Sequence, residues 1–321
     1  MAGKETSSPL LIISGKGGVG KTTISAALGL TLARAGKRVL LVEVRGENRI
    51  PPLFEKSPAG YTEKEISPNL YSISITSEDA AREYLKIRLI VKLAYETLVE
   101  HPLFQFVIEA IPGLADLFSL GKIWDLHRFG HQRQKRWWYD YIILDSPPTG
   151  QGISFLRVPE VIISTLRLGP VVMEAKKIQK LLSDKSQTRL LIVTIPEEMA
   201  VSEAVEYWKR AKNELDIHLG PIIINNVLPG LFSPEEKKWL SGHPGISEPL
   251  AGLVEPARVR ILREENQREE INRLKEEIRW GKFVEVPLFS QPAWEEKDLL
   301  EIGNLLRPEL FPGFSGKIKG K

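Results

Sequence analysis

A glycine-rich segment near the first residues of the chain has the residue types that bind phosphate. Residues 15–22 read Gly-Lys-Gly-Gly-Val-Gly-Lys-Thr and match the pattern G-x-x-x-x-G-K-[ST]. In this pattern the backbone N–H groups surround phosphate oxygens, the lysine (Lys21) reaches the β- and γ-phosphates, and the hydroxyl of Thr22 binds Mg²⁺. The segment therefore predicts a nucleoside-triphosphate site. The residues expected to surround the nucleotide are Gly15, Lys16, Gly17, Gly18, Val19, Gly20, Lys21, Thr22 and Thr23.

The same segment also fits a dinucleotide-binding loop. Gly15, Gly17 and Gly20 match G-x-G-x-x-G, and Glu43 lies near the place where such folds keep a ribose-binding acid. Both patterns use glycine so that the backbone can approach phosphate at a helix N-terminus. The pair Lys21–Thr22 has no use in a dinucleotide site, so the sequence favours a nucleoside triphosphate.

A triphosphate loop needs a second acid at the end of another buried strand, where it completes the magnesium shell. Asp145 follows the apolar run Tyr-Ile-Ile-Leu at residues 141–144 and precedes Ser-Pro-Pro-Thr-Gly. An aspartate after a strand is often only a helix cap. Together with the glycine loop, however, Asp145 is predicted to hold Mg²⁺, with Thr22 as the other protein ligand.

The elements that must position these residues alternate between strands and helices. Residues 10–14 are predicted to be a buried strand, residues 21–35 a helix that ends at Gly36, and residues 39–44 a second strand. This order makes a βαβ unit and predicts an α/β fold with a mainly parallel sheet flanked by helices. Further strands are expected at residues 139–144, 190–194, 221–225 and 283–286. We expect one P-loop domain over residues 1–321, with a helical insertion subdomain at residues 78–137.

Composition excludes several classes of site and partner. The chain has 321 residues and no cysteine, which excludes disulfides, thiolate metal sites and cysteine nucleophiles. Its 44 basic and 41 acidic residues give no broad basic excess, so nucleic acid is not expected as a partner. No apolar run approaches the roughly 18 residues of a membrane span, and the first residues are too polar for a signal peptide. We expect a cytoplasmic protein with at most peripheral membrane contact.

Two motifs together resemble those of a known family. The glycine loop carries an additional lysine, Lys16, as in the deviant Walker A loop, and the second acid lies in Asp-Ser-Pro-Pro-Thr-Gly at residues 145–150. In these features the chain resembles the ArsA/Get ATPases, which include arsenite-pump ATPases and targeting factors for tail-anchored proteins. Weaker matches follow in family order at residues 110–116, 193–198, 224–229 and 286–288. The resemblance covers almost the whole chain and corresponds to one ATPase half.

The resemblance implies a P-loop ATPase that uses ATP and Mg²⁺ in a face-to-face dimer, either a homodimer or a heterodimer with a related ATPase. It implies that Lys16 reaches across the interface to the partner's phosphates, and that Lys21 and Lys16 act in catalysis. It further implies that Asn225 hydrogen-bonds adenine and that the backbone near Pro287 packs on the ring. Asn225 also suits a turn at a strand end. A protein client is expected at the helical subdomain.

The chain departs from the family after the second strand. Arg45 stands where relatives have the aspartate that orients the attacking water, and arginine cannot accept a proton because it stays protonated. Glu43 and Glu47 are the candidates to replace that acid, and their spacing does not decide between them. Gln151 stands where targeting factors often have histidine; it either orients water or is simply a polar residue at a helix start. The alternative to an ATPase is therefore a non-hydrolysing regulator or the weak half of a heterodimer.

The helical segment contains an apolar stripe whose default interpretation is ordinary core, with a client- or membrane-facing groove as the alternative. Its members are Leu103, Phe104, Phe106, Val107, Ile108, Leu114, Leu117, Phe118, Ile123 and Trp124. A membrane- or DNA-positioning ATPase is disfavoured by the balanced charge and by the long insertion.

Overall fold

A computed structural model describes residues 9–88, 111, 113–130, 139–242, 248–279, 281–289 and 294–311. Within these residues eight strands form one sheet in the order β3-β4-β2-β5-β1-β6-β7-β8. All neighbouring strands are parallel except β3, which is antiparallel to β4 at one edge. The predicted α/β fold with a mainly parallel sheet is confirmed.

The central strands are short apolar runs because helices cover both faces of the sheet, as parallel sheets require. Every residue of β1 (Leu10–Gly15) and β2 (Val39–Val44) is buried. Leu10 and Ile12 belong to one core, whereas Leu11 and Ile13 belong to the core on the opposite face. The other strands that the sequence predicts in this parallel sheet are β5 (Tyr141–Asp145), β6 (Thr188–Thr194), β7 (His218–Val227) and β8 (Phe283–Pro287). Each lies where the sequence predicts a strand, with ends that differ by a few residues.

Two strands were not predicted. They are β3 (Lys64–Ser67) and β4 (Leu70–Ile75), which follow a short 3₁₀ helix at Pro51–Phe54. β3 is a four-residue edge strand with one buried position. In β4 the serines Ser72 and Ser74 are buried beside the strand β2, so the strand lacks the continuous apolar run of its neighbours.

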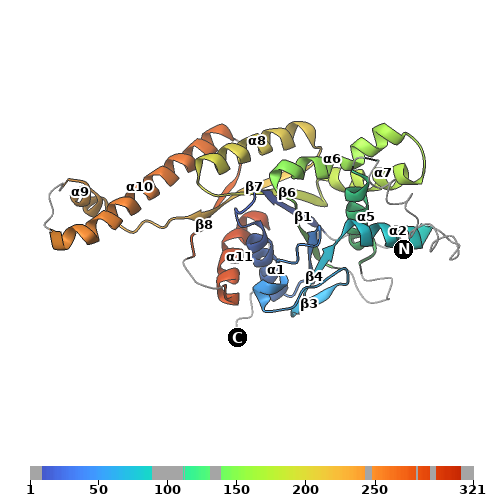
Figure 1. The fold of residues 1–321 in the computed structure, drawn as a ribbon, viewed down its shortest axis with the longest axis horizontal. Helices are drawn as coiled ribbons and strands as arrows, with labels where there is room; N and C mark the ends of the chain where they lie inside the picture. The colour runs from blue at the N-terminus through green and yellow to red at the C-terminus, as the bar shows by residue number, and fades with distance from the viewer. Residues whose placement is uncertain are drawn as a thin grey trace.

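Helices α1 (Lys21–Arg34) and α11 (Glu296–Leu310) cover one face of the sheet (Figure 1). They pack closely because α11 has a glycine at the crossing: a Cβ on Gly303 would lie 1.9 Å from Thr31 Oγ1 and 2.5 Å from the Ala27 carbonyl oxygen. Arg34 Nη2 also contacts the Glu296 carboxylate at 2.6 Å. The helix that begins at the glycine loop is thus held against the sheet by α11.

The opposite face is covered by α6 (Thr149–Leu166), α7 (Pro170–Ser183) and α8 (Glu198–Glu214). From the region predicted as a helical insertion, the structure describes α2 (Ser77–Arg88) and α5 (Leu114–Phe129). The Tyr84 and Phe118 rings pack against each other between these helices, with their centroids 5.3 Å apart. Leu114, Leu117, Phe118 and Ile123 are buried in the core, which is the default interpretation of the apolar stripe. Its members Leu103, Phe104, Phe106, Val107 and Ile108 lie outside the described residues.

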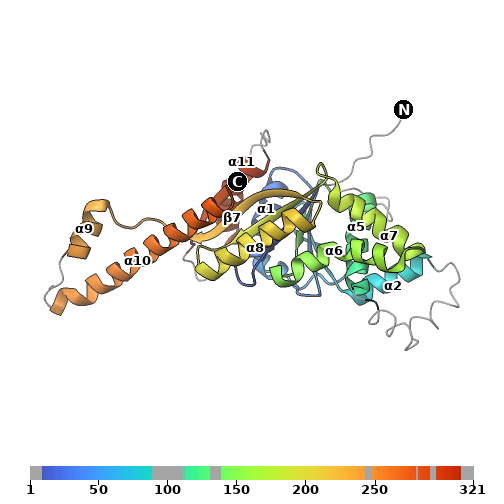
Figure 2. The ribbon, with the colours of Figure 1, turned by 90° about the horizontal axis from the view of Figure 1, so that it is seen from above.

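Helices α9 (Pro234–Gly242) and α10 (Glu248–Glu277) form an arm that projects from the body of the molecule (Figure 2). One end of α10 packs on the core through Ile271 and Leu274. Farther out, the nearly buried Glu264 carboxylate accepts bonds from Lys237 Nζ at 3.0 Å and Arg260 Nε at 2.9 Å. In the described parts of the chain no helix is both long and apolar enough to span a membrane.

Candidate functional site

The glycine loop lies between β1 and α1, at the edge of the sheet where the parallel strands end. Gly20 adopts φ 94°, which favours glycine, and a Cβ there would lie 2.3 Å from Asn225 Nδ2. α1 begins at the next residue and has no acidic side chain in its first turn. Its N-terminal N–H groups and their dipole therefore favour an anion at the loop.

Asp145 meets this loop because β5 lies beside β1, with Ile13 opposite Asp145 in the register. The Thr22 hydroxyl donates to Asp145 Oδ2 at 2.6 Å. The Lys21 ammonium donates to the Lys16 carbonyl oxygen at 3.0 Å. The structure thus brings together the lysine, the hydroxyl and the acid that the sequence predicts for a triphosphate site.

The Asp145 carboxylate fits a cation ligand. Burial raises its pKa to about 6, while the Thr22 bond and the Lys21 charge act in the opposite direction. Oδ1 is buried and has no hydrogen-bonding partner among the described residues. Burial also lowers the pKa of Lys21. Among the residues that the structure describes, no group of three or more histidine, aspartate or glutamate side chains could hold a metal ion. Mg²⁺ does not need such a group, because it is often held by one carboxylate together with phosphates and water.

Glu43 lies next to Asp145 across the sheet, but its carboxylate has a structural role. The N–H groups of Arg49 and Ile50 donate to it at 2.5 and 3.2 Å, so it fixes the loop that follows β2. The side chain is only 2% exposed, and this burial raises its pKa to about 7 despite the two N–H donors.

Arg45, the residue that departs from the family pattern, connects three elements. It follows β2 in a left-handed conformation with φ 66°. Its guanidinium donates to the Gln151 side-chain oxygen at the start of α6 and lies 3.6 Å from Asp116 Oδ1 in the first turn of α5. Arg45 and Gln151 were separate candidates from the sequence, and nothing in the sequence indicated that they are bonded to each other.

Lys16 is paired within its own chain. Its ammonium lies 3.3 Å from Glu203 Oε2 on α8, and the other oxygen of Glu203 accepts the Thr149 hydroxyl. Sequence reasoning missed Glu203, because no local motif marks it and its partners lie far away along the chain. This pair holds the Lys16 side chain against α8.

Asn225 and Pro287 lie at the ends of β7 and β8. The Asn225 amide is buried and donates to the Val19 carbonyl oxygen at 2.9 Å, so it supports the glycine loop from the side. Pro287 pairs with Val227, and the Leu288 N–H donates to the Val227 carbonyl at 2.8 Å. The contact with Val19 gives Asn225 a role that the sequence did not indicate, and contact of these two residues with adenine stays a prediction.

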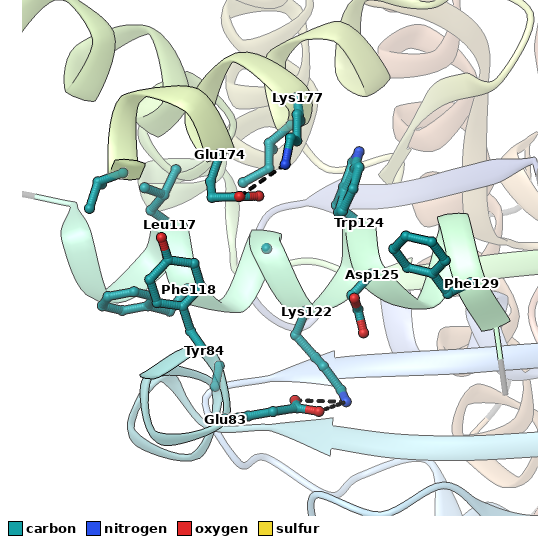
Figure 3. A pocket seen from close by; sticks show the side chains of 14 residues that line it. Glu83, Tyr84, Leu117, Phe118, Lys122, Trp124, Asp125, Phe129, Glu174 and Lys177 are labelled. Carbon is teal, nitrogen blue, oxygen red and sulfur yellow. Dashed lines mark hydrogen bonds and ion pairs between the residues drawn. The ribbon is translucent and has the colours of Figure 1, made fainter. Parts of the chain in front are cut away.

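A cavity of about 490 Å³ lies between α2, α5 and α7 (Figure 3). Its walls are mainly apolar and aromatic, with Leu117, Phe118, Trp124, Phe129, Val171 and Ile178 among them. Two ion pairs, Glu83–Lys122 at 2.8 Å and Glu174–Lys177 at 3.0 Å, lie at its margin. The cavity and the loop after β2 are linked through α5, which carries Phe118 in the cavity wall and Asp116 beside Arg45.

Comparison with known families gives a direct match. The model of the ArsA ATPase family, described as anion-transporting ATPase, matches residues 9–169 and 167–238. The chain belongs to this family. The match contains the glycine loop, Asp145 and Asn225, and the P-loop fold described above is the fold expected for an ArsA-family ATPase.

Curated relatives of this ArsA-family chain are also named as ATPases. It is 33% identical over 252 residues to the ATPase BagA of Mycobacterium tuberculosis, covering 76% of this chain and 73% of that protein. It is 28% identical over 249 residues to an arsenical pump-driving ATPase of Escherichia coli, covering 71% of this chain but only 40% of that protein. ATPase-like nucleotide binding is therefore the function that the family relationship supports.

Proposed function

We propose that this chain is a cytoplasmic, Mg²⁺-dependent ATPase that works as a dimer and couples its nucleotide state to a rearrangement of that dimer. The residues form one ATPase unit over 1–321 with a helical insertion at 78–137. ATP binds at the glycine loop, where Lys21 and the loop N–H groups hold phosphate. Thr22 and Asp145 hold Mg²⁺, which offsets phosphate charge when bound.

The contact between Thr22 and Asp145 is the observation that carries this proposal. A hydroxyl and a buried carboxylate 2.6 Å apart, beside a lysine at a helix N-terminus, form the protein's share of a Mg·triphosphate site. A dinucleotide site needs neither group. The orphaned Oδ1 of Asp145 supports the same assignment, because a buried acceptor without a donor is costly unless it serves a ligand.

Dimerisation in this proposal changes the partner of Lys16. In the single chain its ammonium is held by Glu203, which keeps it near the loop but neutralised. In the dimer, Lys16 would exchange Glu203 for the phosphates bound to the opposite subunit. Turnover then depends on assembly, because a charge supplied in trans stabilises the transition state of phosphoryl transfer.

The helical part is the proposed place for a protein client or partner. The apolar cavity between α2, α5 and α7 offers a surface that could bury apolar side chains. The ion pair between Arg45 and Asp116 joins that part to the loop after β2. A change at the nucleotide can therefore reach the cavity through a direct contact.

One observation favours the alternative, a nucleotide-binding regulator that does not hydrolyse ATP or the weak half of a heterodimer. The Gln151 side-chain oxygen accepts a hydrogen bond from Arg45, so in this conformation it is engaged by Arg45 and not by a water. The ATPase proposal therefore requires an acidic residue other than the one that Arg45 replaces to orient the water.

Binding and turnover of Mg·ATP, measured over a range of protein concentrations, test the proposal. Turnover per subunit should rise with concentration and vanish in Lys21→Ala. Lys238→Ala, which removes an exposed lysine on α9 in the arm, is the matched control and should behave as wild type. Tight ATP binding without turnover would support the regulator, and absence of binding would refute both functions.

A further inference from the structure

Helix α8 contacts the glycine loop through two side chains on one of its faces. Glu203 and Tyr207 are four residues apart, so they lie on the same side of the helix. The Glu203 carboxylate lies 3.3 Å from the Lys16 ammonium within the loop. The buried Ser14 hydroxyl, near the end of β1, donates to the Tyr207 hydroxyl at 2.9 Å. α8 is thus attached to the chain on both sides of Gly15.

The same face of α8 also contacts the start of α6. The second oxygen of the Glu203 carboxylate accepts the hydroxyl of Thr149, the first residue of α6. Three residues further along α6, a Cβ on Gly152 would lie 2.9 Å from the Tyr207 hydroxyl oxygen and 3.0 Å from Ser14 Oγ. α6 therefore approaches this face closely, and α8 holds the glycine loop and the start of α6 together.

The two side chains of α8 differ in how firmly they are held. Tyr207 is only 3% exposed, so its bond with Ser14 belongs to the core of the subunit. The ion pair between Lys16 and Glu203 is more accessible, with 34% and 35% of the two side chains exposed. Pairs of this kind change an equilibrium by only a few-fold and are weakened by salt. Lys16 is therefore held by a contact that is weak enough to be exchanged for another anion.

We propose that Glu203 is a positioning residue that controls the release of Lys16 and thereby sets the protein concentration at which ATP-bound subunits assemble. The inference rests on the dimeric ATPase proposed above, in which Lys16 leaves Glu203 for phosphate on the opposite subunit. Each subunit must break its own ion pair before it assembles. The carboxylate that remains keeps the Thr149 hydroxyl as a donor and is partly exposed to water, so the release of Lys16 does not leave a buried, unpaired charge.

The test compares wild type, Glu203→Gln and the control Glu206→Gln, which removes an exposed carboxylate from the same helix. Glutamine still accepts the Thr149 hydroxyl but does not attract the lysine. Assembly is measured by sedimentation velocity with Mg²⁺ and AMP-PNP, an ATP analogue that is not hydrolysed. One partly exposed pair changes an equilibrium by about 2–5-fold, and a symmetric dimer breaks two such pairs. The concentration at half-maximal assembly should therefore fall by about 4–25-fold in Glu203→Gln and stay at the wild-type value in Glu206→Gln.

Two further measurements show whether the effect comes from the charge that holds Lys16. At about 0.5 M salt the Debye length is about 4 Å, so wild type and Glu203→Gln should assemble within about 2-fold of each other. The Kd of the unassembled subunit for Mg·ATP should change by less than about 3-fold, because Glu203 acts on Lys16 and not on the bound phosphates. A purely structural side chain would not give a difference that salt removes.

The outcomes separate this inference from the function on which it rests. Equal half-maximal concentrations in wild type and Glu203→Gln, with wild type hydrolysing ATP, refute the role of Glu203 and leave the ATPase intact. Weaker assembly of Glu203→Gln also refutes it, because the carboxylate would then support the dimer. A gain in ATP affinity as large as the gain in assembly, or an equal shift in Glu206→Gln, refutes it by showing a general effect of charge. A wild-type protein that binds Mg·ATP but neither assembles nor hydrolyses it refutes the inference and the dimeric ATPase together.

Discussion

The buried carboxylate of Glu43 makes the stability of this protein depend on pH in a direction opposite to that of an ion-paired acid. Its pKa is about 7 in the folded chain, against 4.5 as the ordinary value, because burial disfavours the charged form. Below pH 4.5 the group is protonated in both states, and its favourable contribution is complete. As the pH rises through 7, the folded protein must bury a charge that the unfolded chain keeps in water, and that contribution is lost.

The size of the effect follows from the shift of the pKa. A shift from 4.5 to about 7, at about 1.4 kcal/mol for each unit, corresponds to a loss of about 3 kcal/mol in the free energy of unfolding. Asp145 has a raised pKa of about 6 and adds a loss in the same direction. Asp145 is present in both wild type and a Glu43 variant, so a comparison of the two largely isolates Glu43.

Glu43→Gln should therefore flatten the pH profile of stability. The amide carries no charge at any pH, and its oxygen still accepts one of the two backbone N–H bonds. We expect the imperfect second bond to lower the free energy of unfolding by about 1–2 kcal/mol at every pH. Between pH 4.5 and 8, the fall in the free energy of unfolding should be about 3 kcal/mol smaller in the variant than in wild type. At the upper end of this range the variant should equal or exceed wild type in stability.

Urea unfolding at several pH values, followed by tryptophan fluorescence, measures both curves, since the chain has seven tryptophans. Glu55→Gln removes an exposed carboxylate just after the 3₁₀ helix; it is the matched control and should reproduce the wild-type profile. Wild-type and Glu43→Gln curves that run parallel from pH 4.5 to 8 would refute the reasoning, because they would show that Glu43 binds protons equally in both states.

Two further predictions concern the glycine loop and the helix packed behind it. Lys16→Ala should lower kcat far more than ATP affinity in steady-state and equilibrium assays, because in the proposed function the lysine acts across the dimer; equal losses would make it an ordinary loop residue. Gly303→Ala should lower the free energy of unfolding by about 2 kcal/mol in urea titrations, because its Cβ would overlap Thr31. Gly252→Ala, with open space around it on α10, should instead be neutral or slightly stabilising, and equal effects at both positions would contradict the packing argument.

The glycine loop and its contact with Asp145 were predictable from the sequence, because a triphosphate site requires fixed residue types in a short local motif and an acid at the end of a neighbouring strand. Lys21 and Thr22 lie within one local motif, and Asp145 follows an apolar strand whose neighbour in the sheet is β1. Strands covered on both faces are nearly continuous apolar runs, so β1, β2 and β5 could be predicted from their composition. β4 escaped because its buried serines interrupt this pattern, and β3 because it is short, charged and at the edge.

The contacts between distant segments could not be predicted in the same way. Nothing in the local sequence pairs Lys16 with Glu203 or Arg45 with Asp116, since each pair joins a loop to a helix that comes near it only in the folded chain. The choice between Glu43 and Glu47 shows the same limit. Both are acids near the end of one strand, and only the fold reveals that Glu43 is buried under two N–H groups while Glu47 stays accessible. Burial and partner choice are properties of the tertiary structure.

The packing of α11 against α1 has a consequence for the synthesis of the protein. The ion pair between Arg34 and Glu296 spans 262 residues, and the Gly303 contact with Thr31 spans a similar length. A chain that leaves the ribosome from its N-terminus therefore exposes the side of α1 that packs on α11 until α11 has been translated. Contacts of such long range form late and leave apolar surface open to aggregation or to chaperones in the meantime. The glycine loop is therefore translated long before α11, the helix that covers its supporting helix α1.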